Sequence, residues 1–143
     1  MHMDNIHVMV NVFCTTEEGM FFINVFADNG LKQGENSLKI WCMYKLTSNV
    51  FAIDDLSEVF DGFRIVSNDL THIVLGCDRE SAYIYPLFEE SDRFIKYTIK
   101  ASIKGSHRHG LPVGLLGHAS SDNSDFSTFL VEKGIESISV ATA

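Results

Sequence analysis

The chain has 143 residues, of which 45% are hydrophobic and 21% charged, and its formal net charge is −8. This length suits one domain with a sizeable core, so residues 1–143 are expected to form a single domain. The acidic balance argues against a nucleic-acid surface, which needs clustered Lys and Arg, but it does not exclude a local site for a small anion. Three cysteines without paired spacing favour a reducing compartment. Neither a basic leader nor a run of ~20 apolar residues is present, so a cytoplasmic protein without a membrane partner is expected.

Hydrophobic periodicity predicts alternating strands and helices. The apolar runs predict strands at residues 6–13, 38–44, 63–66, 112–116 and 135–140. Helices are predicted at about residues 15–29, 54–60, 91–105 and 126–133, the first capped by Thr15 or Thr16 and the third by Ser91 or Asp92. The third helix is expected to present Phe94, Ile95, Ile99 and Ile103 on one face. This alternation indicates an α/β fold with a parallel sheet.

Polar residues follow the central apolar run. Phe63–Val66 gives way to Ser67, Asn68 and Asp69. Parallel α/β folds place their chemistry at such strand ends. The simpler alternative is that Asn68 and Asp69 hydrogen-bond nearby amides and shape a turn.

The letters around this strand end extend into a longer pattern. Ser67–Thr71 reads S-N-D-L-T, and L-G-x-D-R-x-S-A follows at residues 75–82. Further segments are T-x-E-E-G at residues 15–19, N-G-L-K-x-G-E-N at 29–36, S-N-V at 48–50 and F-L-V-E-x-G-I-x-S-I-S at 129–139. Together they resemble, in the same order, the C-terminal phosphoenolpyruvate/pyruvate-binding barrel of the phosphoenolpyruvate synthase and pyruvate phosphate dikinase family.

The resemblance implies a partial (β/α) barrel. Five strand units correspond to the C-terminal part of a TIM-type barrel, which has eight and usually takes about 250 residues. The family's nucleotide-binding and phosphohistidine domains have no counterpart here. Two sheet edges and an apolar face would then be uncovered, which normally drives association. We expect a homo-oligomer, dimer or larger, or a chain that completes the barrel, unless the chain closes differently from the family.

The resemblance also assigns a metal and substrate site, with changes at its centre. Asp69 matches a magnesium ligand, and Asn68 matches a residue that touches the substrate, pyruvate or phosphoenolpyruvate. Lys45 stands where the family has the other carboxylate ligand, and an ammonium group cannot ligate magnesium. No cofactor is therefore expected, unless the family's magnesium site persists. We predict instead that Lys45 pairs with Asp69 and could also hydrogen-bond Asn68. The alternative is that Lys45 extends to solvent and Asp69 caps its turn. Cys14 occupies the position of a substrate-binding arginine.

The stretch Gly114–His118 matches the family's G-I-C-G-Q, in which the cysteine is the general acid. Leu116 takes the place of that cysteine and has no exchangeable proton. Gly117 and His118 are the remaining substrate-binding candidates there. Cys14 or His118 could act as a substitute acid, or each could be structural.

These matches lead to two functional hypotheses. The first is a degenerate, non-catalytic relative of the family domain that serves as a self-associating or partner-binding module. The alternative is a subunit or fragment of a phosphoenolpyruvate synthase-like phosphotransferase (pyruvate, water dikinase), completed by another chain and binding pyruvate or phosphoenolpyruvate.

Other candidate residues carry weaker signals. His107 and His109 are spaced like a metal pair in a predicted loop, but without a third ligand a solvated loop is favoured. His72 is expected to orient the turn after Asp69. Asp78 and Arg79 match a family motif, and a local ion pair or helix cap explains them equally well. The aromatic residues are expected in the core: Phe21, Phe22, Phe26, Trp41 and Phe51.

Overall fold

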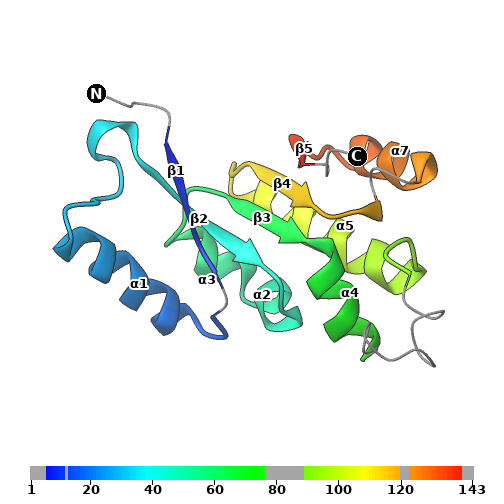
Figure 1. Ribbon diagram of the computed structural model, residues 1–143, viewed down its shortest axis with the longest axis horizontal. Helices are drawn as coiled ribbons and strands as arrows, with labels where there is room; N and C mark the ends of the chain where they lie inside the picture. Colours follow the sequence, from blue (N-terminus) through cyan, green and yellow to red (C-terminus); the bar gives the residue numbers. More distant parts are fainter. Residues whose placement is uncertain (1–5, 12, 77–88, 120–122, 140–143) are drawn as a thin grey trace.

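A five-stranded parallel sheet in the order β1-β2-β3-β4-β5 forms the centre of the computed structural model, which describes residues 6–11, 13–76, 89–119 and 123–139 (Figure 1). The strands are β1 His7–Val10, β2 Lys39–Tyr44, β3 Phe63–Val66, β4 Val113–Leu116 and β5 Ser137–Ser139. The helices are α1 Thr16–Asp28, α2 Thr47–Phe51, α3 Ile53–Ser57, α4 Ser67–Leu75, α5 Arg93–Arg108 and α7 Ser124–Glu132, with a 3₁₀ turn, η1, at Glu35–Ser37. The predicted α/β class with parallel strands is confirmed.

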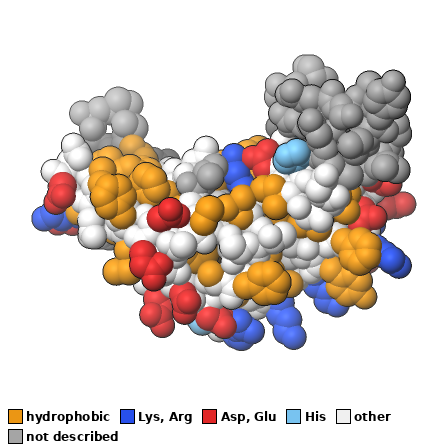
Figure 2. Space-filling model, turned by 90° about the horizontal axis from the view of Figure 1, so that it is seen from below, with side chains coloured by type: hydrophobic (Ala, Val, Ile, Leu, Met, Phe, Trp, Pro, Cys, Tyr) orange, Lys and Arg blue, Asp and Glu red, His pale blue; other side chains and the backbone are white. Residues whose placement is uncertain are grey.

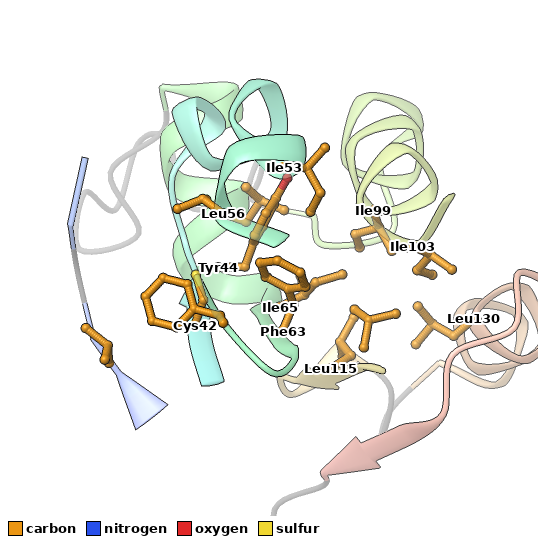
Figure 3. Packing of buried hydrophobic residues seen from close by; sticks show 14 of the residues in the cluster. Cys42, Tyr44, Ile53, Leu56, Phe63, Ile65, Ile99, Ile103, Leu115 and Leu130 are labelled. Carbon is orange, nitrogen blue, oxygen red and sulfur yellow. The ribbon is translucent and has the colours of Figure 1, made fainter. Parts of the chain in front are cut away.

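The two faces of the sheet differ. Because side chains alternate along a strand, the register of the paired strands assigns every residue to one face. One face carries fully buried side chains, among them Ile40, Cys42, Tyr44, Phe63, Ile65, Val113 and Leu115, and the described helices pack against it (Figure 3). The other we call the open face, because none of the described helices covers it (Figure 1). It consists of His7, Met9, Lys39, Trp41, Met43, Arg64, Val66, Gly114, Leu116, Ser137 and Ser139.

The first helix begins and ends as its sequence predicts. Thr15 caps α1: its hydroxyl accepts from the Glu18 backbone N–H at 3.3 Å, and the Glu18 carboxylate accepts from the Thr15 N–H at 3.2 Å. This reciprocal pair is a capping box. Gly30, just beyond the helix, has a φ of 83°, which favours glycine.

The longest helix, α5, differs from its prediction in two ways. Asp92 caps it, and Ile95, Ile99 and Ile103 are buried as expected, but Phe94 is 51% exposed, so its predicted place on the buried face is wrong. The helix also continues past Gly105 to Arg108. A Cβ at Gly105 would lie 2.9 Å from the Ile53 side chain, so this glycine permits close packing with α3.

Two short helices were not predicted. Ser67, Asn68 and Asp69 form the first turn of α4 and not a separate turn, since a strand can pass directly into a helix whose N-terminus favours such residues. The other, α2, lies within the S-N-V segment. There the buried Asn49 accepts from the Leu46 N–H at 3.1 Å and donates to the Phe13 carbonyl at 3.3 Å.

The aromatic residues are less buried than expected. Phe51 is 88% and Phe21 62% exposed, so their predicted place in the core is wrong, and hydrophobic side chains are visible on the surface in Figure 2. Phe22 and Phe26 are partly buried against the core. Trp41 is only 8% exposed, but it lies on the open face.

Some residues discussed in the sequence analysis lie outside the residues that the structure describes. Cys14 is an exposed and Cys42 a buried free thiol, whereas Cys77, Asp78 and Arg79 lie outside the described residues. Within the described part of the chain, none of the helices has the length and apolar character needed to cross a membrane.

Candidate functional site

A pocket of about 350 Å³ lies where β2, β3 and β4 end. Parallel strands bring their carboxyl ends to one edge of the sheet, so residues distant in sequence meet there. The lining residues are Met43, Lys45, Val66, Asn68, Asp69, Leu116, Gly117 and His118. All the predicted site residues from these three strand ends therefore meet in one pocket. Cys14 is exposed and is not among the lining residues.

An ion pair occupies this pocket. Lys45 Nζ lies 2.6 Å from Asp69 Oδ2, and the two side chains are 17% and 33% exposed. The predicted pairing of these residues is thus confirmed. A partly exposed pair of this kind contributes about 1 kcal/mol or less to stability. Removing only one partner costs more, because it leaves a partly desolvated charge unpaired.

The residues present do not fit a magnesium ion. Magnesium takes oxygen ligands in octahedral geometry, and a carboxylate is normally among them. Here the Lys45 ammonium contacts an oxygen of Asp69, the carboxylate assigned to the metal. No group of three or more His, Cys, Asp or Glu residues capable of holding a metal was found among the described residues. A cation at this place would have to displace the ammonium group.

A buried carboxylate behind the pocket was not foreseen from the sequence. Glu90 is 8% exposed, and its Oε2 accepts from the Ser67 hydroxyl at 2.5 Å. The pocket wall has no room for a side chain at Gly117, because a Cβ there would lie 2.9 Å from the same Glu90 oxygen. Glu90 thereby fixes the segment before α5 against the ends of β3 and β4. No motif or spacing connects Ser67 with Glu90, so only the fold could reveal the contact.

The chemical groups of the pocket suit binding more than proton transfer to carbon. Leu116 is 39% exposed and offers only hydrocarbon at the position assigned to a general acid. His118 is exposed at the end of β4. The ammonium of Lys45 and the amide of Asn68 can hydrogen-bond a small carboxylate. The pocket thus combines a cation and polar donors with an apolar wall.

The other candidate histidines belong to two separate contacts. His107 and His109 lie at the end of α5 and not in a loop, which corrects the prediction. His107 Nε2 lies 2.9 Å from Glu136, and His109 Nε2 lies 2.7 Å from Asp54. Their partners are different acids, so the two rings do not form a metal pair. They attach the end of α5 to neighbouring segments.

Solved structures place the fold among enzyme barrels. A Cryptosporidium parvum pyruvate kinase in complex with ADP matches 94% of this chain with a TM-score of 0.68 at 13% identity. A HpcH/HpaI aldolase/citrate lyase family protein from Burkholderia cenocepacia matches 94% with a TM-score of 0.66 at 8% identity. The chain covers 26% and 58% of these two chains. The molecule is therefore an α/β protein with the architecture of a partial TIM-type barrel.

Sequence relatives define the family. Residues 4–143 match the model of the PEP-utilising enzyme, PEP-binding domain, and the chain belongs to this family. Phosphoenolpyruvate synthases of Synechocystis sp. and Aquifex aeolicus are 44% and 41% identical over 98% of the chain. The Escherichia coli enzyme is 36% identical over the same share. The chain spans only 16% to 18% of the length of these three relatives.

Proposed function

We propose that this chain is a degenerate, non-catalytic form of the PEP-binding domain and acts as a self-associating or partner-binding module. The observation that carries the proposal is the contact between Lys45 and Asp69, 2.6 Å apart in the pocket. An ammonium has replaced the carboxylate that the family resemblance assigns to the metal. Leu116 adds to this, because a hydrocarbon side chain cannot exchange a proton with the substrate.

An activity assay tests the non-catalytic part of this proposal. We expect no phosphoenolpyruvate from pyruvate and ATP, either with the chain alone or with a phosphohistidine donor domain added. Turnover that disappeared in Cys14→Ala or His118→Ala would overturn the proposal and identify the substitute acid.

The origin of the ion pair is tested by restoring the acid. Lys45→Glu would face Asp69 with a second carboxylate, and two such groups favour a divalent cation between them. We expect magnesium to raise the melting temperature of this variant but not that of the wild type, because a ligand that binds the folded state stabilises it. Lys104→Glu, on the exposed side of α5, is the control. A magnesium-dependent rise in the wild type, or none in Lys45→Glu, would contradict a converted metal site.

A second candidate function keeps the substrate and dispenses with the metal. It is a subunit or fragment of a phosphoenolpyruvate synthase-like phosphotransferase that binds pyruvate or phosphoenolpyruvate and is completed by another chain. The names of the relatives and the pocket lined by Lys45, Asn68 and His118 favour it. Pyruvate or oxalate should then raise the melting temperature equally in EDTA and in magnesium, and Lys45→Met should abolish the rise. No shift with any of these anions would remove this candidate.

A further inference from the structure

A groove of about 310 Å³ lies between α5 and α7, apart from the pocket at the strand ends. It is lined by four cations and two aromatic residues: Arg93, Lys96, Lys100, Lys133, Tyr97 and Phe129. None of these residues also lines the pocket at the strand ends. The two cavities are therefore separate.

Most of the positive charge of this groove comes from α5, which differs in charge from the rest of the chain. The helix holds five of the 11 Lys and Arg residues, at positions 93, 96, 100, 104 and 108, and none of the 19 Asp and Glu residues. Like charges three or four positions apart destabilise a helix, and a cation in the first turn opposes the helix dipole. Local helix stability therefore does not explain this pattern.

An aromatic ring holds two of the cations at the bottom of the groove. Lys96 Nζ lies 5.8 Å and Lys133 Nζ 5.7 Å from the centre of the Phe129 ring, which is close enough for cation–π attraction. The ring is fixed in turn, because it stacks on the fully buried Phe126 at a centroid distance of 6.2 Å. Both lysines are half-buried, so their ammonium groups are partly positioned before any ligand arrives.

The four cations of the groove have no acidic partner in the part of the chain that the structure describes. None of them lies within 4.0 Å of a carboxylate, whereas four other cations do: Lys32, Lys39, Lys45 and Arg108. Cations gathered without a counter-charge create a local positive potential that attracts an anion. The net charge of −8 opposes this only weakly, because charges more than about 8 Å away are largely screened at physiological salt.

We propose that this groove binds a small organic phosphate whose apolar part is a flat ring. A phosphate monoester suits the cations better than a carboxylate, because it has about −1.5 to −2 charges at pH 7 and three acceptor oxygens. Lys96 and Lys133 bind these oxygens from below, and Arg93 and Lys100 bind them from the edges. The ring of the ligand lies against Tyr97, whose side chain is 69% exposed.

The size of the groove favours a small molecule over an extended partner. Ligand sites usually measure about 300–1,000 Å³, so this groove accommodates one ring and one phosphate. The proposal adds a second site and does not depend on the function proposed above, which concerns the pocket at the strand ends.

Matched ligands and matched variants test the two parts of the groove. Phenyl phosphate and methyl phosphate carry the same charge but differ in the ring, and benzyl alcohol has a ring without charge. Each would be titrated into the full ¹⁵N-labelled chain at constant ionic strength, with NMR shifts giving both the affinity and the location. The double variant Lys96→Gln/Lys133→Gln removes the two central cations. Its control, Lys32→Gln/Lys104→Gln, removes two exposed lysines outside the groove, and Lys45→Met alters the other pocket.

We expect phenyl phosphate to bind with a Kd below about 5 mM, at least about tenfold more tightly than methyl phosphate, and benzyl alcohol not to bind. The shifts should lie on α5 and α7. Lys96→Gln/Lys133→Gln should weaken phenyl phosphate at least about tenfold, because it removes two charge-assisted hydrogen bonds. Lys32→Gln/Lys104→Gln and Lys45→Met should change the Kd less than about twofold.

Four results would overturn the proposal. They are no binding up to about 10 mM, equal binding of the two esters, equal weakening in both double variants, and loss of binding in Lys45→Met. The last would place the ligand in the pocket at the strand ends. Circular dichroism checks that each variant folds. Where Lys96→Gln/Lys133→Gln did not fold, the wild-type shifts decide, because shifts away from α5 and α7 would also overturn the proposal.

Discussion

At the scale of single residues, the contact between Lys45 and Asp69 determines what the pocket can hold. An unpaired carboxylate at the end of a parallel strand attracts cations. The charge of a carboxylate that is already paired with an ammonium group is compensated without a metal. We expect Lys45→Met or Asp69→Ala alone to destabilise the fold by about 1–3 kcal/mol, since each leaves one partly buried charge. The double variant should be less destabilised than the sum of the two, with a coupling of about 1 kcal/mol.

Urea unfolding of the four species measures this coupling. Lys104→Met, which removes an exposed lysine from α5, controls for the loss of charge. If the free energy of unfolding of each single variant were within about 0.5 kcal/mol of the wild-type value, solvent would already screen the pair.

The two described thiols should differ sharply in reactivity. Burial raises the pKa of Cys42, whose side chain is fully buried, whereas Cys14 is exposed. Because the thiolate is the reactive form, we expect iodoacetamide to modify Cys14 rapidly and Cys42 only after unfolding. Mass spectrometry of the peptides, with and without urea, distinguishes the two sites. Rapid native modification of Cys42 would show that β2 opens on the time scale of the reaction.

The site was predictable from sequence only where a motif fixed a residue to a strand end. Lys45 and Asp69 are 24 positions apart, yet the resemblance assigned them to the ends of adjacent strands, and the predicted contact is present. Glu90 follows no such rule. Its place beside Ser67 depends on how the segment before α5 returns to the sheet, which is a property of tertiary packing.

At the scale of elements, close packing of α3 against α5 depends on Gly105. Alanine normally stabilises a helix interior relative to glycine by about 1 kcal/mol. Here the added Cβ would meet Ile53 at 2.9 Å, and overpacking of this kind costs about 1–3 kcal/mol. We therefore expect Gly105→Ala to lower stability despite the propensity gain, and to be tolerated better in an Ile53→Val background. Thermal unfolding of the single and double variants measures this, and an increase in stability for Gly105→Ala alone would contradict the packing argument.

The same two helices are joined at the surface by Asp54. His109 and Arg108 hydrogen-bond its carboxylate and lower the pKa of Asp54 below its ordinary value of 3.8. A lowered pKa stabilises the fold above pH 3.8, and this contribution is lost as the pH falls through the value in the folded state. Asp54→Asn should therefore lower the melting temperature at about pH 5 but have little effect at about pH 2.5. An equal loss at both pH values would assign the effect to packing instead of charge.

Elements were predictable in proportion to their length and periodicity. The strand at 63–66 was predicted correctly, and Asp92 is one of the two caps predicted for α5, because a short, mainly apolar run and a capping residue before a periodic helix are strong local signals. The helices α2 and α4 were missed because their polar first turns, Thr47–Asn49 and Ser67–Asp69, also suit turns. Phe94 was placed on the wrong face because one position rotates a helical side chain by about 100°.

At the scale of the whole molecule, the sequence predicted a partial barrel but not how the side chains pack on the two faces of its sheet. Local patterns specify which strand residues alternate, and thus the open face, but not that Trp41 and Arg64 lie flat over glycines. That arrangement depends on Gly62, just before β3, lying beside the Trp41 ring and on Gly114 pairing with Arg64. Figure 2 shows acidic and apolar side chains distributed over the outer surface, where single exposed hydrophobic residues are ordinary. The open face combines exposed apolar side chains, Met9 and Leu116, with the buried indole Nε1 of Trp41, which has no hydrogen-bond partner among the described residues.

If the chain self-associates as proposed, its stability should depend on protein concentration. Partners that bind only the folded state raise the melting temperature by mass action, so a dimer should melt higher at about 100 µM than at about 1 µM. Met9→Lys places a charge on the open face and should remove this dependence, whereas Met20→Lys, on exposed α1, should retain it. Both positions are solvent-exposed methionines, at 43% and 52%, so the substitutions are matched in chemistry. Differential scanning calorimetry at the two concentrations measures the effect. The open face would not form the contact if the wild-type melting temperature did not depend on concentration. The same would follow if both variants lost that dependence equally.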